Sequence, residues 1–311
     1  MKKQLRFNLL SLVLLLSPTL FQCSQIPVTE TSETKPSVLS NESGTDRIQQ
    51  ASQQLANNYL SKTPASLVTA DLTLAEAQEI KAAFLEILAK TFGSQVGYKA
   101  GLTSKPAQER FGVSEPVLGV LFEQMLLPNG AVLPPDFGAR PMTEGDLIVR
   151  VGSEEINNAK TIQEVLENLD AVIPFIEVPD LVYGSEVKLD GKAIAAINVG
   201  TRYGILGDPI LLEKTEDWET RLGAISLEIL DGDRNLLATG NSNALLGHPL
   251  NVVLWIKNTL QAEGKQLKPG DLLSLGTITP LMPVKPNTTI RAKYIGLDPK
   301  GDVEIFVKFE E

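Results

Sequence analysis

Short apolar runs separated by glycine and proline fill the chain from Val96 to Glu311. Runs of about four to eight residues rich in Val, Ile and Leu have the length of β-strands and are too short for typical helices. We expect strands at residues 96–100, 131–133, 147–149, 171–175, 193–197, 225–229, 272–275, 289–294 and 303–307. Many strands with few helices between them favour an α+β domain built on a mixed, curled β-sheet.

Helical periodicity comes mainly before this region. Apolar side chains recur every three or four residues in 47–60 and again in 74–92, which is the spacing of one helix face. We therefore expect an N-terminal helical region at 47–95 and the β-rich domain at 96–311. The segment Asp71–Leu74 is expected to cap the second helix without a clear capping box.

Two further helices are expected inside the β-rich domain. Residues 161–169 and 250–264 are helical in pattern, the latter with Pro249 in its first turn and Gly264 at its end. Proline suits the first turn of a helix and glycine the position after its last residue.

Residues 1–23 have the pattern of a bacterial export signal. The basic residues Lys2, Lys3 and Arg6 precede an apolar stretch at 7–16 that is short for a membrane span. An exported, cell-envelope protein is expected, and a cytoplasmic one if this leader is not used.

The one cysteine of the chain, Cys23, follows this leader directly. Leu20 and Cys23 match a lipoprotein cleavage box, whereas Gln22 stands where a small residue is usual. A lipid-anchored Cys23, simple secretion and an uncleaved anchor all remain open. Residues 24–46 are rich in Ser, Thr, Glu, Pro and Asn, which predicts a disordered tether that would hold the folded part away from the membrane.

Composition excludes several classes of site. The net charge of −10 argues against a general nucleic-acid surface and favours small-molecule partners. With one cysteine and one histidine, zinc sites of the Cys/His type and internal disulfides are excluded by count. A Ser-His-Asp triad would need His248, and the sequence has neither a nucleophile elbow nor a phosphate loop to support one.

Three acidic residues are candidate ligands for one hard divalent cation. Glu144 and Asp146 lie two apart in an expected strand, so they project from the same face with Gly145 pointing away. Glu177 follows a separate apolar run. Carboxylates gathered in a partly buried cluster need a cation or a proton, and Mg²⁺ or Mn²⁺ prefers such oxygen ligands. The pair by itself is more typical of a solvated strand end, and the surrounding segments decide the interpretation.

Several motifs together resemble the fumarylacetoacetate hydrolase superfamily, and more closely its branch of 2-oxopent-4-enoate hydratases and 4-oxalocrotonate decarboxylases. The resemblance covers about residues 47 to 311. It rests on Gly97–Thr103, Arg110–Gly119, the acid pair after Pro141, Glu177, Asn198 before Gly207, Leu246–Asn251, and Pro269–Gly276 with Pro280.

The resemblance implies a β-roll fold and a divalent metal held by Glu144, Asp146 and Glu177. The metal would chelate the carboxylate and the 2-oxo or 2-enol oxygen of a short 2-oxo acid and act as a Lewis acid. Lys99 matches the glycine-flanked lysine of the family. Its charge would stabilise the substrate carboxylate or enolate, or it would take part in proton transfer. Relatives commonly assemble, so a homo-oligomer is also implied.

Four polar residues are weaker candidates. His248 is attractive as the lone histidine, but its place before Pro249 also suits a simple helix cap. Asn198, Ser242 and Thr277 lie near glycine-rich turns and are expected to line the substrate pocket, although each alone suits an ordinary turn.

Two departures from the family pattern bear on the reaction. Val117 and Ile197 stand where the hydratases tend to have Asp, and Asp146 stands where many relatives have Glu. The first two replacements remove potential acid/base groups and move the expectation slightly towards decarboxylation or an altered substrate.

The leading hypothesis is a metal-dependent lyase of the hydratase or decarboxylase type acting on a short 2-oxo or 2-hydroxydienoic acid, as in aromatic catabolism. One alternative is an exported binding protein that has the same fold and no turnover. The other is an acylpyruvate-type C–C hydrolase that uses the same metal site.

Overall fold

The structure is a computed structural model and describes residues 44–66 and 72–311. The predicted leader, Cys23 and most of the tether at 24–46 lie outside these residues. Residues 44–46, assigned to the tether from sequence, instead form the first turn of α1 (Gly44–Ser61).

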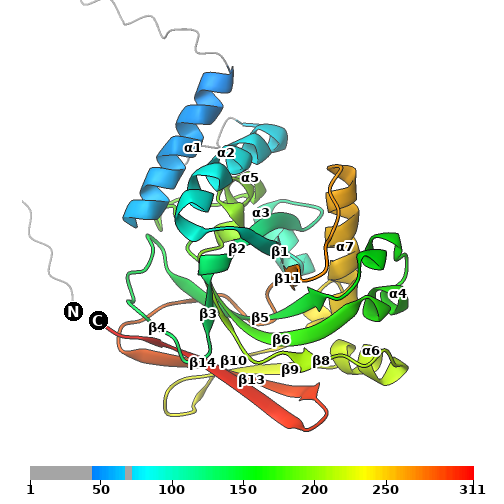
Figure 1. Ribbon diagram of the computed structural model, residues 1–311. Coiled ribbons are helices and arrows are strands. Elements are labelled where there is room, and N and C mark those ends of the chain that lie inside the picture. The colour runs from blue at the N-terminus through cyan, green and yellow to red at the C-terminus, as the bar shows by residue number, and fades with distance from the viewer. Residues whose placement is uncertain (1–43, 67–71) are drawn as a thin grey trace, which may run out of the picture. The chain divides into compact units, whose positions relative to one another are not determined.

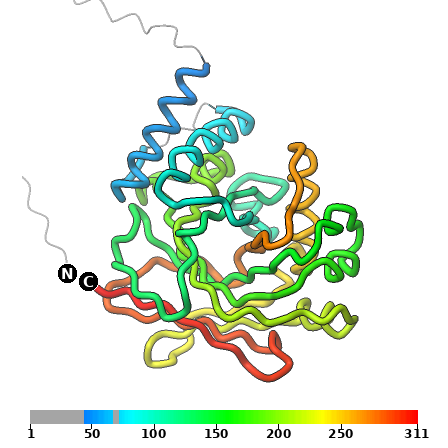
Figure 2. Tube along the Cα trace, in the orientation of Figure 1, coloured from blue at the N-terminus to red at the C-terminus, as the bar shows by residue number. Residues whose placement is uncertain are grey.

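A nine-stranded mixed sheet forms the centre of the fold (Figure 1). Its main path is β2 (Val117–Phe122), β1 (Gln95–Gly101), β11 (Leu272–Ser274), β5 (Met142–Val151), β6 (Leu169–Val178), β7 (Tyr203–Leu206) and β3 (Leu126–Pro128). Two short strands, β12 (Met282–Pro283) and β8 (Ile210–Leu211), pair with β5 and β6. The long antiparallel pair β5 and β6 runs side by side through the middle of this sheet, as the tube in Figure 2 shows.

A second sheet of five strands packs against the first. Its order is β10 (Leu236–Asn241), β9 (Ser226–Leu230), β13 (Thr288–Asp298), β14 (Gly301–Phe309) and β4 (Val132–Leu133). Side chains of both sheets and of α7 share one buried apolar cluster. The predicted α+β class with a mixed, curled sheet is confirmed, and the strands divide into two sheets.

Besides α1, the helices are α2 (Leu74–Phe92), α3 (Lys105–Phe111), α4 (Ile162–Glu167), α5 (Gly191–Ala196), α6 (Glu216–Gly223) and α7 (Pro249–Ala262). In Figure 1, α1, α2, α3 and α5 lie on the side of the large sheet away from the small sheet, whereas α6 lies at the end of the small sheet and contacts β13. Short 3-10 turns are η1 (Glu123–Met125), η2 (Glu154–Asn158), η3 (Asn198–Gly200) and η4 (Ser242–Ala244). In the described ranges, none of the helices combines the length and the apolar character that crossing a bilayer requires.

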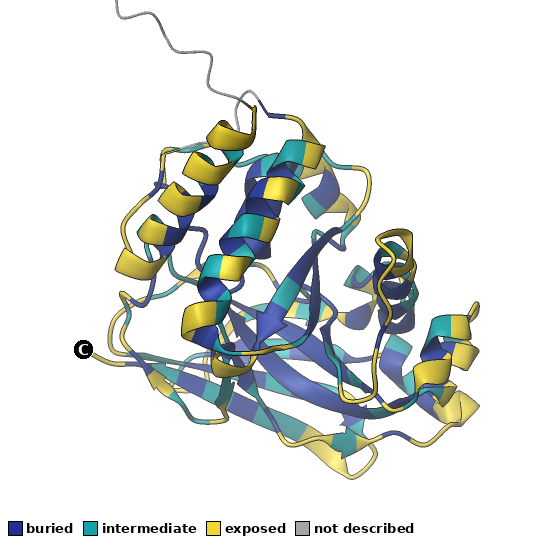
Figure 3. Ribbon diagram, turned by 45° about the horizontal axis from the view of Figure 1, so that its top comes forward, coloured by how far each residue is buried: buried dark blue, intermediate teal, exposed yellow. Residues whose placement is uncertain are grey.

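The helices α1 and α2 share a second apolar cluster with α5 and β2. Leu55 and Tyr59 of α1 and Phe84 of α2 are fully buried there, with the Tyr59 and Phe84 rings edge to face at 5.5 Å. Figure 3 shows the same amphipathic division, with buried residues on the inner faces of both helices and exposed ones outside.

The start of α2 corrects one prediction. Thr73 caps the helix by accepting a hydrogen bond from the Glu76 amide (3.2 Å), and the Glu76 carboxylate accepts one from the Thr73 amide (2.8 Å). This is a capping box, which the sequence shows as Thr-x-x-Glu.

The segment 193–197, predicted as a strand, lies almost wholly in helix α5. The Asp190 side chain accepts from the Ala193 amide (2.9 Å) and so starts the helix. A short apolar run that is buried on every side carries no periodicity, so strand and helix look alike in sequence. Helices α3 and α6 were not predicted either. The signals for α3 are Ser104 as N-cap and Gly112 at φ +67° as C-cap.

Candidate active site

The β5–β6 register brings the three candidate carboxylates onto one face. Glu144 lies directly opposite Glu177, and Asp146 pairs with Phe175 two positions along. Directly opposed residues have Cβ atoms about 4.5–5.5 Å apart, and diagonal neighbours are about 7–8 Å apart. The predicted convergence of separated stretches of chain therefore follows from strand pairing.

The packing of the two sheets explains why a glycine, Gly145, lies between Glu144 and Asp146. Its missing side chain faces the small sheet, where an added Cβ would lie 2.4 Å from a Leu227 methyl carbon of β9. The glycine allows the small sheet to press against β5 while Glu144 and Asp146 point to the opposite face.

All three carboxylates are withdrawn from solvent: Glu144 is 6% exposed, Asp146 0% and Glu177 1%. Burial, followed by the negative charge of Glu177, raises the pKa of Glu144 and of Asp146 well above the usual range. The contact between the Glu144 and Glu177 side chains also raises the pKa of Glu144. A divalent cation at this place would relieve the same repulsion.

Lys99 of β1 supplies the positive charge in this cluster. Its ammonium group is buried, forms an ion pair with Glu177 and donates a hydrogen bond to the Val199 carbonyl (3.1 Å). Val199 has φ +58°, a costly conformation for a β-branched residue. The strained turn thus places the Val199 carbonyl next to the Lys99 ammonium group.

The residues fit a hard divalent cation in chemistry, because three buried carboxylates share one face of β5 and β6. Glu177 Oε2 is buried and has no hydrogen-bond partner within the described residues, so one ligand oxygen is available. Among the residues that the structure describes, however, no group of three acidic, histidine or cysteine side chains is gathered closely enough to hold a metal ion as it stands. Asp146 instead accepts from Ser274 Oγ (2.5 Å) and from the Leu147 amide (2.5 Å). Ligation would require side-chain rotation towards a common point.

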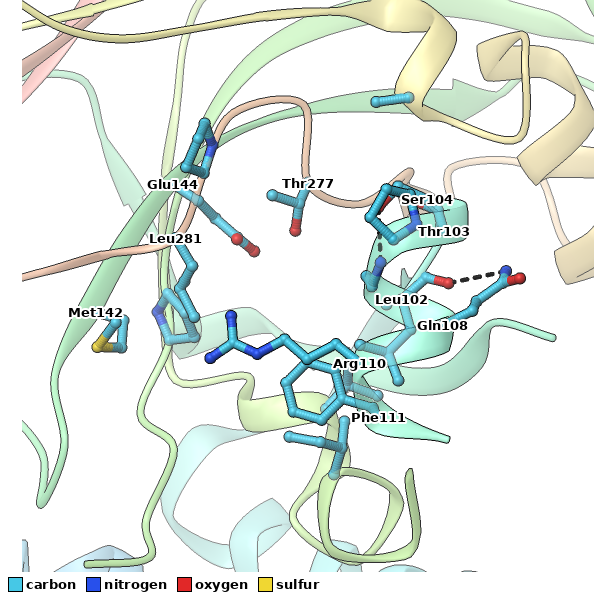
Figure 4. Close-up of a pocket in the computed structure, with 18 of the residues that line it drawn as sticks. Leu102, Thr103, Ser104, Gln108, Arg110, Phe111, Met142, Glu144, Thr277 and Leu281 are labelled. Atoms are coloured by element: carbon cyan, nitrogen blue, oxygen red, sulfur yellow. Dashed lines mark hydrogen bonds between the residues drawn. The ribbon is translucent and has the colours of Figure 1, made fainter. Parts of the chain in front are cut away.

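A cavity of about 1090 Å³ opens beside the carboxylates. Glu144, Lys99 and Thr277 line it, whereas Asp146 and Glu177 do not and are buried. Figure 4 shows the Glu144 carboxylate and the Thr277 hydroxyl both pointing into this space. Thr277 therefore stands where a pocket residue was predicted.

Asn198 and Ser242 were also predicted to line the pocket. Their side chains instead form hydrogen bonds with main-chain groups. The Asn198 amide bridges both backbone groups of Val120 in β2, accepting from the N–H (2.7 Å) and donating to the carbonyl (2.9 Å). Ser242 Oγ accepts from the Ile225 amide (3.1 Å). Neither side chain lines the cavity.

His248 occupies a capping position at the start of α7. Its Nδ1 accepts from the Leu250 amide (3.2 Å), and its Nε2 lies 3.0 Å from the Glu219 carbonyl oxygen. With both ring nitrogens engaged and the side chain outside the cavity lining, this position corresponds to the capping interpretation of the sequence.

Sequence reasoning missed several residues of the site. Ser274, bonded to Asp146, had one signal: it is a polar residue inside the apolar strand β11. Thr103 lines the cavity with a buried hydroxyl that has no partner within the described residues. Arg110, which opens the Arg110–Gly119 motif, and Arg140 also line the cavity, and neither was singled out as a site residue from the sequence.

Comparison with known proteins agrees with this geometry. No model of a known protein family matches the chain. The 2-keto-4-pentenoate hydratase of Paraburkholderia xenovorans is 29% identical over 205 residues, covering 65% of this chain and 73% of that protein. The 4-oxalocrotonate decarboxylase of Pseudomonas sp. strain CF600 is 28% identical over 227 residues, covering 73% of this chain and 84% of the relative.

The similarity extends to a solved structure, that of 4-oxalocrotonate decarboxylase from Pseudomonas putida G7 complexed with magnesium and adipate. It superposes with a TM-score of 0.74 at 25% identity and covers 85% of this chain and 98% of the other. The chain is therefore similar, in sequence and in fold, to the 2-keto-4-pentenoate hydratases and 4-oxalocrotonate decarboxylases. In this chain, Val117 and Ile197 are both buried in the apolar cluster beneath α2. They act as core residues, and carry no acid/base group where the hydratases tend to have Asp.

Proposed function

We propose that this protein is a divalent-metal-dependent lyase of the hydratase or decarboxylase type that acts on a short 2-oxo acid related to 2-oxopent-4-enoate. The observation that carries the proposal is the buried trio of Glu144, Asp146 and Glu177 on one face of β5 and β6, beside Lys99 and a cavity. Curated relatives named as hydratase and decarboxylase support the same reaction class.

Glu144, Asp146 and Glu177 are the proposed ligands of Mg²⁺ or Mn²⁺. When bound, such an ion supplies Lewis acidity towards a 2-oxo group. Lys99 would orient the substrate carboxylate and offset negative charge that develops next to it, since its ammonium group lies between Glu177 and the cavity. Thr277 would help to orient Glu144, since both side chains point into the same part of the cavity.

A decarboxylase or an altered substrate suits the site better than hydration of the usual kind. Hydration needs groups that deliver a proton and orient water. Val117 and Ile197 are apolar and buried, so neither supplies such a group. Hydrolysis of a C–C bond also needs a base for water, and His248 is engaged at both ring nitrogens away from the cavity.

Glu177→Gln tests the proposal. The substitution removes one carboxylate while keeping the shape of the side chain, so we expect weaker metal binding and loss of turnover by more than about 100-fold. Mn²⁺ affinity is measured by calorimetry and turnover with 2-oxopent-4-enoate and its six-carbon dicarboxylic analogue. Glu228→Gln, on β9 of the small sheet, is the control. Unchanged Mn²⁺ affinity and activity in the Glu177 variant would reject this metal site.

An exported protein without turnover is distinguished in the same experiment. Tight Mn²⁺-dependent binding of a 2-oxo acid to the wild-type protein, with no product from any substrate, favours a binding function. Turnover that Glu177→Gln abolishes favours the lyase.

We also propose export, lipid attachment at Cys23 and assembly into a homo-oligomer. The basic and apolar pattern of residues 1–23 supports the first two. If Cys23 carries the anchor, Cys23→Ser shifts the protein from the membrane fraction to the soluble fraction; an unchanged distribution rejects lipid attachment.

A further inference from the structure

Half-buried apolar side chains form much of the wall of the cavity beside Glu144. Six of them both line the cavity and pack against the apolar cluster beneath α2. They are Leu102, Phe111, Met142, Val187, Leu189 and Leu281. Each is covered by the protein on one side and leaves part of its surface open at the cavity. Apolar surface that faces water gains free energy when an apolar occupant covers it.

This apolar wall begins next to the proposed metal ligands. The register of β12 on β5 brings Leu281, the residue before β12, next to Glu144. In Figure 4, Leu281 and Met142 lie on the same side of the cavity as Glu144, and Leu102 and Phe111 lie across from them. A ligand held at Glu144 would therefore contact apolar side chains with the rest of its carbon chain.

The packing of two segments holds the opposite wall in place. An added Cβ on Gly191, the first residue of α5, would lie 2.0 Å from a Val113 methyl carbon and 3.5 Å from the Phe111 carbonyl oxygen. The glycine allows the end of α3 to lie against the segment that carries Val187 and Leu189. The apolar side chains of both segments therefore line the cavity together.

The basic side chains at the cavity are in contact with solvent. Lys105, Arg110 and Lys188 are exposed residues. Arg110 extends across the cavity beside Phe111 (Figure 4), with its guanidinium 5.4 Å from the centre of the ring. Such a side chain lays its aliphatic stem along apolar surface and keeps its charged group in water. Exposed cations at a cleft attract the carboxylate of a 2-oxo acid and require no charge on its far end.

We propose that the cavity binds a 2-oxo acid with an uncharged, apolar tail that is longer than the chain of 2-oxopent-4-enoate. This inference names a substrate class within the proposed function and rests on that function. Pockets of about 300–1,000 Å³ enclose drug-sized ligands. The cavity of about 1090 Å³ is therefore larger than a five-carbon acid fills. An alkyl tail covers the apolar wall, whereas a polar end would lose its hydration there.

A series of 2-oxo acids of increasing length tests this substrate class. Calorimetry with Mg²⁺ compares 2-oxopentanoate, 2-oxohexanoate and 2-oxooctanoate, which differ only in methylene groups. We expect the affinity to rise about threefold for each added methylene, or about 30-fold from the first acid to the last. 7-Hydroxy-2-oxoheptanoate matches 2-oxooctanoate in length but ends in a hydroxyl, so it should bind at least about fivefold less tightly.

Two variants remove apolar surface from separate segments of the wall. Phe111→Ala and Leu189→Ala should each lower the ratio of the 2-oxooctanoate and 2-oxopentanoate affinities by about fivefold. Thermal unfolding shows whether either variant has lost its fold, in which case the other carries the test. Leu211→Ala, at an exposed position of β8 outside the cavity, is the matched control and should keep the wild-type ratio. Affinities that do not rise with length in the wild type, or a rise that both wall variants retain, would overturn the proposal.

The dependence on Mg²⁺ separates this proposal from the proposed function. Mg²⁺-dependent binding of all three acids with equal affinity retains the metal site and rejects the apolar tail. An affinity that rises with chain length and does not depend on Mg²⁺ retains the apolar wall and rejects the metal-dependent function. If none of the acids binds, both proposals are wrong.

Discussion

Tyr294 is the residue that connects the small sheet to the proposed metal site. Its buried hydroxyl lies 2.7 Å from the Asp146 carbonyl and 2.7 Å from the Phe175 carbonyl, and accepts from the Phe175 amide (2.9 Å). The neighbouring Pro174 has no N–H to give to the ladder opposite Leu147. The tyrosine of β13 therefore supplies polar contacts to both strands beside the position where Pro174 has no N–H to donate. Burial raises the pKa of Tyr294, so the hydroxyl keeps its proton for donation.

Tyr294→Phe should weaken metal binding through Asp146. Losing the hydroxyl leaves buried backbone groups unpaired, so we expect the free energy of unfolding to fall by about 1–3 kcal/mol. The Mn²⁺ dissociation constant should rise about tenfold or more, as for other groups that orient a ligand. Denaturant unfolding and calorimetry measure the two effects. Tyr59→Phe, which loses a buried hydrogen bond to the Thr201 carbonyl elsewhere, should lower stability alone. Equal metal affinity in the Tyr294 variant and the wild type would contradict this role.

At the scale of the element, α2 carries a cation on its buried face. Lys81 donates from Nζ to the Leu118 carbonyl of β2 (2.8 Å) and joins the helix to the sheet edge. Burial lowers the pKa of Lys81 to about 8, because the charged form loses its hydration. The hydrogen bond of Lys81 thus joins α2 to β2, and its effect on the free energy of unfolding depends on pH.

The direction of this pH dependence follows from comparing the protonation of Lys81 in the folded and the unfolded protein. Between pH 8 and 10.5 the unfolded chain keeps a proton that the folded protein releases, so stability should rise with pH in this window. The rise is up to about 1.4 kcal/mol per pH unit. We expect Lys81→Met to remove this rise of stability with pH. The measurement is the difference in unfolding free energy between wild type and variant from pH 7.5 to 9.5. Lys90→Met, at an exposed position of the same helix, should keep the wild-type slope. A pH-independent difference for the Lys81 variant would refute the prediction.

At the scale of the whole molecule, one buried arginine connects the N-terminal helices to the sheet. Arg202 donates to the Tyr59 carbonyl at 2.7 Å and to Asp180 at 3.2 Å, and its guanidinium lies 4.3 Å from the centre of the Tyr59 ring. The Asp180 carboxylate also accepts from the amides of Ala139 (3.1 Å) and Arg140 (2.8 Å). The attachment of α1 and the loop that enters β5 therefore depend on the same ion pair.

Arg202→Ala should destabilise the whole fold by about 3–5 kcal/mol, because it leaves the buried Asp180 charge without its partner. Hydrogen exchange should quicken in α1 and in 137–142 together, while β13 and β14 remain protected longest. The exposed pair of Arg234 and Glu304 provides a comparison, since Arg234→Ala should cost less than about 1 kcal/mol. Loss of protection in α1 alone would show that the loop does not depend on this pair.

The sequence predicted β1, β5, β6, β9, β11, β13 and β14, the two long N-terminal helices and α7, because each of these has a periodicity or a cap that depends on near neighbours. The strands β2, β7 and β10 were not predicted. The prediction of a strand at 193–197 was wrong, because a segment buried on every side shows no hydrophobic periodicity that distinguishes a helix from a strand. The capping box of Thr73 and Glu76 was present in the sequence and was overlooked.

For the candidate site, local spacing determined that Glu144 and Asp146 share a face, and the family pattern pointed to Glu177 and Lys99. Only the tertiary structure decided that Glu177 stands directly opposite Glu144, that Ser274 and Tyr294 hold Asp146, and that Arg110 and Arg140 line the same cavity. Local patterns are set by neighbours along the chain. Which strands pair, in which register, and which side chains then meet depend on burying the two sheets against each other, and that free energy belongs to the whole fold.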